Sequence, residues 1–473
     1  MATGRIKFSG GESPSVDELA GGMPIQQNVL TDAAGAIRMR PGISALSFFP
    51  TIIPNASPVI GMSRWGQYLI YVTNDRKLWA LHPLGGVTAL SSATATTQLD
   101  GGLRPVFAST RTRVIVTGGG KPQKWEGSGL SARLGGNPPA ATHVTTIAQR
   151  IVINAADPSG IIYWSELGDT GAETWNTGLN FREAETKQDP VVGIYENSNE
   201  IVALGTETIQ MLSPDPSQVF TNARTMEIGT NVAQSYVGLD EKFLILDNRN
   251  RIMVSEGRSF EPVSAPMIGQ ILDDSTADND NDCWGFRYKF GNYDLGIFQF
   301  PTDGRTLAID TMTQQWTEFR SANSSGQQVG FAITSSYFWA EQNITVVGLS
   351  TGQIAKLDAS ATTDLGTPVT AQVTSSFEGH ATSYNKKNNA LLLRFTRGRQ
   401  PIGDTSVLQY SYRDDLGPFC DPFLFDMGDA STVDPVVAIR SMGTYRQRQH
   451  RIRYDGGKFN FSGIEESFTV LSP

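Results

Sequence analysis

The sequence predicts an all-β protein, in which a β-propeller of about seven blades (six to eight) is followed by an antiparallel β domain. Three observations predict this fold class. Pairs of β-rich runs recur around polar turns, and glycine makes up 48 of 473 residues, above the average share of about 7%. No stretch keeps the 3.6-residue apolar periodicity of a long amphipathic helix. Many short strands and little helix are therefore expected.

The recurring unit is a β-rich run, a polar turn and a second β-rich run. The runs are rich in Val, Ile, Tyr, Phe and Thr, which suit a pleated sheet. Each turn carries Asn, Asp or Gly, which tolerate the positive φ of a tight hairpin. The seven predicted hairpins begin at Tyr68, Arg113, Arg150, Glu200, Lys242, Asp294 and Asn343. These starts lie 37–52 residues apart, close to the roughly 40–50 residues of a propeller blade.

Short runs before some hairpins are predicted to be the innermost strands of their blades. They are Pro58–Ile60, Pro105–Phe107 and Pro190–Ile194. One small twisted sheet cannot bury both of its faces, whereas blades packed in a closed ring can, and closure protects their edges. A large β-sandwich, or two in tandem, would also give hairpins separated by turns. The period and the number of hairpins favour a propeller rather than sandwiches. The propeller is assigned to residues 51–360.

Residues 1–50 are expected to form an extended N-terminal segment. Pro24, Pro41 and Pro50 break any regular element there. The run Gly42–Phe49 is a candidate to complete or close the ring.

The pattern changes after Leu357. Asp358–Gln372 is rich in Thr, Ala and Ser, which predicts a linker. Longer alternating strands then predict a small sandwich-like domain, assigned to residues 361–473. Its most basic segment supplies the candidate partner-interface residues Arg440, Arg446, Arg448, His450, Arg451 and Arg453. They would contact DNA phosphates or an acidic face of a neighbouring protein, or simply form a solvated strand face.

Charge is distributed unevenly along the chain. Residues 370–473 contain 12 Lys and Arg against 11 Asp and Glu, which leaves 26 against 36 for residues 1–369 and a net charge of −9 overall. This balance argues against a surface that binds nucleic acid everywhere, and it favours protein contact for the basic segment. No apolar run approaches the roughly 18 residues of a membrane-spanning helix. The first residues lack the apolar core of a secretory signal, so no membrane association and no Sec export are expected.

No catalytic, cofactor-binding or metal-binding residues are predicted. Two cysteines, Cys283 and Cys420, are too few for a disulfide framework or a four-cysteine zinc site. The four histidines lie far apart in the sequence, and neither a G-x-S-x-G elbow nor a phosphate-binding loop is present.

An acidic run, Leu272–Asp282, resembles the start of a calcium loop because Asp278, Asp280 and Asp282 alternate. The sixth and twelfth positions of such a loop require glycine and glutamate, and this chain has cysteine and lysine there. A solvated acidic loop is expected instead.

The alternative function is a carbohydrate-binding or polysaccharide-cleaving propeller. A glycosidase needs two carboxylates about 5–10 Å apart in a cleft. Glu166, Asp169, Glu183 and Glu185 are candidates, although nothing in their spacing distinguishes them. The tryptophans stand at strand ends within the repeats, which favours packing between blades over stacking on sugars.

Several segments follow one another in an order that is similar to one protein family. Asn28–Leu46 leads from an asparagine-containing start to Arg-Pro-Gly-Ile, and Ile161–Trp175 holds a Tyr-Trp-Ser strand, a Gly-Asp turn and a tryptophan. Tyr410–Phe419 and Met442–Tyr454 supply two C-terminal strand motifs. Together they resemble the tail nozzle proteins of short-tailed bacteriophages (podoviruses), also called tail hub or packaged-DNA stabilisation proteins. Arg413 departs from that pattern, in which an acidic or polar residue is usual.

The resemblance implies a non-enzymatic structural protein of the virion tail, made in the host cytoplasm and without a cofactor. Such proteins form a homo-oligomeric ring, commonly a hexamer, below the portal and the head-to-tail adaptor. The ring continues the channel through which packaged double-stranded DNA passes without sequence-specific binding during ejection. It also helps retain the genome and docks tail fibres, spikes or a needle.

Overall fold

Strands make up most of the regular structure of this chain. The computed structural model describes residues 2–6, 26–32, 36–46, 57–82, 85–92, 97–157, 159–183, 189–256, 259–264, 266–274, 282–323, 325–395, 407–427, 436–455 and 460–471. In these ranges the α-helices are short, α1 (Gly168–Gly171) and α2 (Pro266–Asp274), and neither is long and apolar enough to cross a membrane. The prediction of an all-β fold is confirmed.

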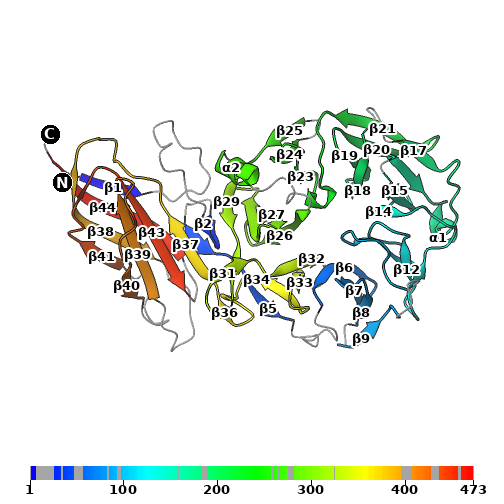
Figure 1. Ribbon diagram of the computed structural model, residues 1–473, viewed down its shortest axis with the longest axis horizontal. Helices are drawn as coiled ribbons and strands as arrows, with labels where there is room; N and C mark the ends of the chain where they lie inside the picture. Colours follow the sequence, from blue (N-terminus) through cyan, green and yellow to red (C-terminus); the bar gives the residue numbers. More distant parts are fainter. Residues whose placement is uncertain are drawn as a thin grey trace.

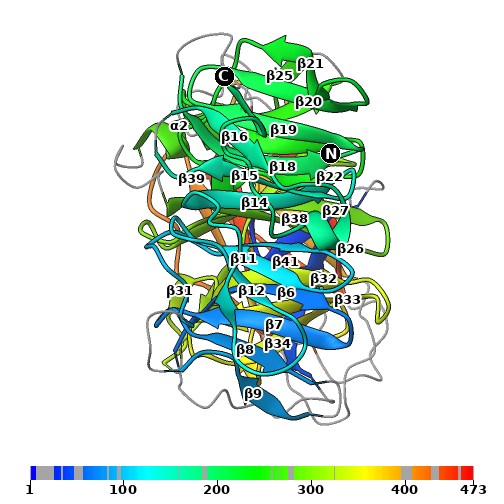
Figure 2. The ribbon, with the colours of Figure 1, turned by 90° about the vertical axis from the view of Figure 1, so that its right-hand side faces the viewer.

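The predicted repeat forms the ring of small sheets in Figure 1, and Figure 2 views that ring edge-on. Seven four-stranded antiparallel units follow one another in the described part of the chain. In each unit the predicted hairpin supplies the second and third strands. The runs that follow Pro58, Pro105 and Pro190 supply first strands. The propeller is therefore confirmed, and the hairpins are correctly placed.

The strands of the first four units occur in chain order. They are β6 (Val59–Trp65), β7 (Tyr68–Thr73), β8 (Leu78–Leu81) and β9 (Val87–Ala89); β10 (Val106–Ser109), β11 (Val114–Thr117), β12 (Gln123–Trp125) and β13 (Ala132–Arg133); β14 (Ala141–Ile147), β15 (Arg150–Ala155), β16 (Ile161–Trp164) and β17 (Phe181–Glu183); β18 (Val191–Asn197), β19 (Glu200–Gly205), β20 (Ile209–Asp215) and β21 (Val219–Met226).

The remaining units include one strand from the N-terminal segment. They are β22 (Val237–Leu239), β23 (Lys242–Leu246), β24 (Ile252–Glu256) and β25 (Ser259–Pro262); β26 (Trp284–Phe290), β27 (Tyr293–Phe300), β28 (Arg305–Asp310) and β29 (Gln315–Glu318); β32 (Ile333–Trp339), β33 (Ile344–Leu349) and β34 (Ile354–Asp358) with β5 (Gly42–Ala45). The 3₁₀ helix η2 (Ala233–Ser235) precedes β22, and the hairpin β30 (Arg320–Ala322) and β31 (Gln328–Gly330) precedes β32.

The ring is closed by the N-terminal segment. Strand β5 lies antiparallel to β34 and completes the last blade. The first and last blades also meet at the Val59 carbonyl, which accepts hydrogen bonds from the hydroxyls of Thr334 (2.8 Å) and Ser335 (2.6 Å). The expectation that residues near Gly42 complete the ring is therefore confirmed for β5, whereas residues 47–49 lie outside the described ranges.

Inner strands approach so closely that Gly61 has no room for a side chain. A Cβ atom there would lie 2.3 Å from Pro105 Cγ and 3.2 Å from Phe107 Cε2 of the next blade. We expect Gly61→Ala to lower the free energy of unfolding by about 1–3 kcal/mol, the usual range for overpacking, as measured by denaturant titration. Gly86→Ala is the control, because a Cβ at Gly86 meets nothing within 4 Å. Equal stability of the two variants would contradict the prediction.

The C-terminal strands form a two-sheet sandwich beside the ring, at the left of Figure 1. Buried Leu391, Ile464, Val373, Tyr410 and Ile452 fill the space between its sheets. One sheet has the order β3 (Val29–Thr31), β4 (Ile37–Met39), β44 (Asn460–Val470), β38 (Lys386–Phe395) and β41 (Val436–Arg440), with β1 (Ala2–Ile6) on β44 and β42 (Thr444–Tyr445) on β38. The facing strands are β2 (Gln26–Gln27), β37 (Thr370–Thr374), β43 (Arg448–Asp455), β39 (Val407–Asp414) and β40 (Phe423–Asp426).

Propeller and sandwich share one continuous sheet. Strand β2 pairs in parallel with β29 of the sixth blade and antiparallel with β37, so nine strands run from β26 to β40. Sequence patterns predicted neither this sheet nor the strands that the structure has in the segment expected to be a linker. There, β35 (Thr363–Asp364) pairs with β36 (Thr367–Pro368) and with β5. Small polar residues suit this segment because it packs closely, with Gly42 directly beneath the carbonyls of Ala361 and Thr363.

Arg40 joins three parts of the fold at this junction. Its side chain is fully buried and pairs with Asp364 through two hydrogen bonds, of 3.0 and 2.6 Å. The other three N–H groups donate to Asn28 Oδ1 and to the carbonyls of Pro41 and Arg320. All five guanidinium donors are therefore used, and the group also lies 4.6 Å from the centre of the Phe331 ring.

Candidate functional site

The six basic residues predicted to form a partner interface do not lie on one surface. Strand β43 runs between β37 and β39, and alternate residues of a strand point to opposite faces. Arg448 and His450 point into the sandwich and are 0% exposed. Arg451 and Arg453 are half-buried on the opposite face. The remaining two, Arg440 at the end of β41 and Arg446 in the turn before β43, are exposed.

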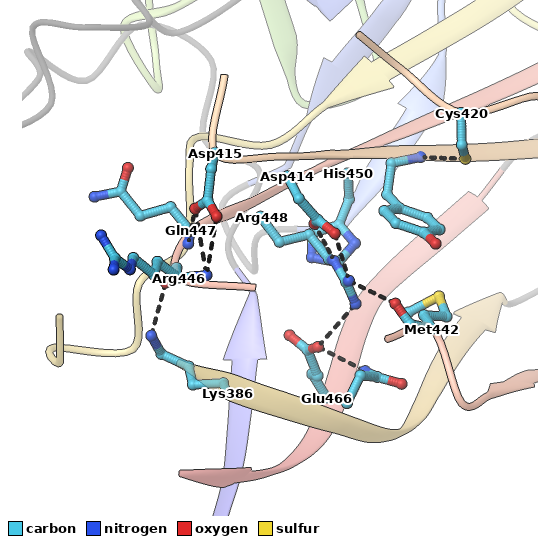
Figure 3. Close-up of polar contacts among 12 residues, drawn as sticks. Lys386, Asp414, Asp415, Cys420, Met442, Arg446, Gln447, Arg448, His450 and Glu466 are labelled. Atoms are coloured by element: carbon cyan, nitrogen blue, oxygen red, sulfur yellow. Dashed lines mark hydrogen bonds and ion pairs between the residues drawn. The ribbon is translucent and has the colours of Figure 1, made fainter. Parts of the chain in front are cut away.

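Arg448 is the centre of a polar network inside the sandwich (Figure 3). Its Nε and Nη2 contact the two oxygens of Asp414 at 2.7 and 3.0 Å, and Nη2 also donates to the Met442 carbonyl at 2.8 Å. Nη1 lies 3.8 Å from Glu466 Oε1. The guanidinium packs between the rings of Tyr412 and Tyr445, 4.3 and 4.1 Å from their centres. This arginine is therefore unavailable to a partner and instead connects β43 with β39 and β44.

Glu466 is the buried acid of this network. It accepts hydrogen bonds from Asn388 Nδ2 at 2.6 Å and contacts His380 Nε2 at 3.0 Å. Burial raises the pKa of Glu466, but hydrogen bonds from His380, Asn388 and Tyr445 outweigh burial and lower the pKa to about 2. Its carboxylate stays charged at neutral pH and balances Arg448 inside the sandwich.

Two buried histidines are held neutral by their surroundings. His450 Nδ1 is 2.8 Å from the Tyr410 hydroxyl, and burial lowers the pKa of His450 to about 3. In the propeller, His143 Nε2 is 3.1 Å from the Tyr195 hydroxyl, and burial lowers the pKa of His143 to about 3 as well. Both imidazoles therefore act as neutral hydrogen-bonding groups.

Because both histidines are neutral in the folded protein, we expect the protein to lose stability in mild acid. Between pH 6.5 and about 3 the unfolded chain binds a proton at each histidine and the folded chain does not, so falling pH favours unfolding. Each site should cost about 1.4 kcal/mol per pH unit over that window. The check is the free energy of unfolding by denaturant titration at several pH values between 6.5 and about 5. His143→Gln with His450→Gln should remove most of the slope, and a flat wild-type profile would contradict the prediction.

A cavity of about 620 Å³ lies among the inner strands of the propeller. It is lined by residues at the beginnings of inner strands, among them Ile60, Arg104, His143 and Cys283. The Arg104 guanidinium lies 4.1 Å from the centre of the Trp284 ring and donates to the Thr334 carbonyl. Arg104, at the entry to the second blade, thus contacts both the sixth and the last blade.

Of the residues considered for chemistry, Glu166, Asp169 and Asp282 make local contacts in the described part of the chain. Glu166 accepts from Asn180 Nδ2 at 2.8 Å and pairs with Arg150, and Asp169 accepts from the Thr112 hydroxyl. Glu183 lies in β17, and Glu185 lies outside the described ranges, as do Asp278 and Asp280. Asp282 accepts from the backbone and hydroxyl of Thr302. In the described part of the chain, no group of three or more His, Cys, Asp or Glu residues could hold a metal ion.

Comparison with known proteins identifies a family. A family model named Phage_stabilise and described as "Bacteriophage P22 Gp10, beta-propeller" matches residues 24–363. This match confirms the resemblance drawn from the sequence motifs. No curated protein matches the chain.

Similar solved structures include three whose sequences are very different from this one. BBS1N in complex with ARL6DN is 10% identical, with a TM-score of 0.45, covering 68% of this chain and 99% of that chain. The WD40 β-propeller domain of Doa1 is 10% identical (TM-score 0.42; 67% and 97% covered). BamB from Moraxella catarrhalis is 13% identical (TM-score 0.41; 75% and 97% covered).

Proposed function

The chain belongs to the Phage_stabilise family of bacteriophage structural proteins, and from this premise we propose that it forms the nozzle, or hub, of a short phage tail. The proposed assembly is a homo-oligomeric ring, a hexamer, below the portal and the head-to-tail adaptor. The ring continues the DNA channel, retains the packaged genome and carries fibres, spikes or a needle. Double-stranded DNA passes through it without sequence-specific binding.

The family match over residues 24–363 is the observation that carries this proposal. The fold supports it in mechanical terms. The propeller is closed by an N-terminal strand, and the sandwich is joined to it through a shared sheet and the buried Arg40–Asp364 pair. A protein built in this way can keep its shape while neighbouring components exert force on it.

The test is a phage carrying a nonsense mutation in the gene for this chain, grown with and without a plasmid copy. Particles made without the chain are expected to package DNA and then lose it, and to lack the distal tail in electron micrographs. The plasmid copy should restore both, and an epitope tag should label the tail. Infectious, DNA-filled particles that form without the chain would overturn the proposal.

Sugar binding is measured separately on the purified protein by a glycan array. Specific binding that is lost on Glu166→Gln or Asp169→Asn would favour the carbohydrate-binding alternative. A negative array, together with labelled tails, supports the nozzle assignment.

A further inference from the structure

Three arginines gather on the outer face of the sheet that contains β43. Arg451 and Arg453 are alternate residues of β43, and Arg413 on β39 pairs with Gln449 of β43. Their core-side neighbours, such as Ile452 and Tyr410, fill the sandwich, so the arginines point the other way. We call Arg413, Arg451 and Arg453 the arginine patch.

Neutral groups hold two arginines of the patch, Arg413 and Arg451, in place. Arg413 Nε donates to Gln449 Oε1 at 2.6 Å, and Arg451 Nε donates to the Ser411 hydroxyl at 3.1 Å. Both guanidiniums lie near the ring of Phe419, at 5.1 and 4.0 Å from its centre. Cation–π contacts and hydrogen bonds of this kind fix a guanidinium without neutralising its charge.

Two of these charges have no counter-ion within the described chain. No ion pair joins Arg413 or Arg451 to a carboxylate there, whereas Arg453 has Asp455 at 3.4 Å. Burial lowers the pKa of Arg451, and the positive charges of Arg453 and Arg413 act in the same direction, while Cys420 opposes them. Three like charges are therefore kept close together with several N–H donors unused. Such an arrangement favours binding of an external anion.

The surroundings of the patch favour a folded acidic partner over DNA. On the same outer face, Val407 of β39 pairs with Asp455 on the neighbouring strand β43 and with Asp426 on the other neighbour, β40. Positive charge is therefore bounded by negative charge, which suits a limited protein surface better than a long polyanion. Exposed Leu424 (65%) on β40, directly opposite Gln409, adds an apolar rim.

The negative charge that would complement the arginine patch is present in the same chain. Residues 1–369 contain 36 acidic against 26 basic residues, whereas residues 370–473 are nearly balanced. We infer that the arginine patch docks on an acidic surface of the propeller of a second copy of this chain. This inference rests on the proposed ring: a contact between two different surfaces of one chain repeats head to tail, as a closed ring requires.

The test compares self-association of the purified full-length chain and of charge-reversal variants by analytical ultracentrifugation. Arg451→Glu with Arg453→Glu should weaken association by about 100-fold or more, since opposed charges become like charges. The control is Lys387→Glu with Arg394→Glu, which makes the same charge change at exposed positions of β38 in the other sheet and should associate as the wild type does. Thermal melts verify that both variants are folded.

The wild-type chain provides a second measurement that does not depend on any variant. Its association should weaken steeply as salt rises from about 50 mM to about 500 mM, because salt screens exposed charges. A chain that is monomeric at low salt, association that ignores salt, or equal association of the two charge variants would each overturn the inference. Binding of a short DNA duplex that is lost on Arg451→Glu with Arg453→Glu, while self-association persists, would assign the patch to nucleic acid and overturn it too. The proposed function and this inference can fail separately. If the epitope tag labels the tail of virions and the Arg451→Glu, Arg453→Glu variant still forms rings, the proposed function stands and this inference fails.

Discussion

Replacing Arg40 with methionine is expected to lower the free energy of unfolding by about 3–5 kcal/mol, because Asp364 is left charged and nearly buried without its partner. The five hydrogen bonds of the guanidinium connect the N-terminal segment, the β30–β31 hairpin that follows the sixth blade, and the segment after the last blade. We therefore expect hydrogen–deuterium exchange to increase first in β5 and β35, where the ring is completed.

The matched control is Arg38→Met, two residues earlier in the chain, on β4. Arg38 is 55% exposed and its contact with Asp32 measures 3.6 Å, so its loss should change stability by no more than about 1 kcal/mol. Adding Asp364→Asn to Arg40→Met should restore part of the loss, since the unpaired charge disappears. If Arg40→Met and Arg38→Met exchange alike, Arg40 does not hold the junction together.

Replacing Arg448 with methionine is expected to destabilise the sandwich by a similar amount, about 3–5 kcal/mol. Glu466 is 0% exposed and would remain charged beside its hydrogen-bonding partners without the arginine. The effect should be confined to β38, β39, β43 and β44, which the network connects, and it should leave the propeller strands unchanged. Amide exchange resolved by peptide provides the measurement.

Arg446→Met is the control for this second change, because Arg446 is exposed and lies only two residues away. Glu466→Gln in the Arg448→Met background should recover part of the lost protection, as both buried charges are then removed. Unchanged protection of β44 in Arg448→Met would refute the role given to the network.

The propeller was predictable because its signal is local and repeated. Each blade carries its own hairpin, with β-forming residues on both sides of an Asn, Asp or Gly turn, as in Tyr68–Leu81. Prolines mark the entry of inner strands, as before Val59 and Val191. Such features depend on residues a few positions apart, which a single sequence displays directly.

The burial of part of the basic segment was harder to predict from the sequence, because it depends on residues far away in the chain. Sequence reasoning grouped Arg448 and His450 with exposed arginines, but Asp414 and Glu466, contributed by other strands, draw Arg448 inside. In the sequence, Arg413 stands out only as a departure from the family pattern. Its pairing with Gln449 across two strands, which brings it beside Arg451, could not be read from spacing. Strict alternation along β43 was the one available signal, and it does separate Arg448 and His450 from Arg451 and Arg453.

Because β5 completes the last blade, the ring can close only late in the synthesis of the chain. Ala45 pairs with Ala355, 310 positions later, so the growing polypeptide leaves the ribosome with β5 lacking its neighbour. At about 5–20 residues per second this interval lasts roughly 15–60 s. During this interval the six preceding blades are synthesised and can form only an open arc. The ring closes after β34 has been translated and can pair with β5.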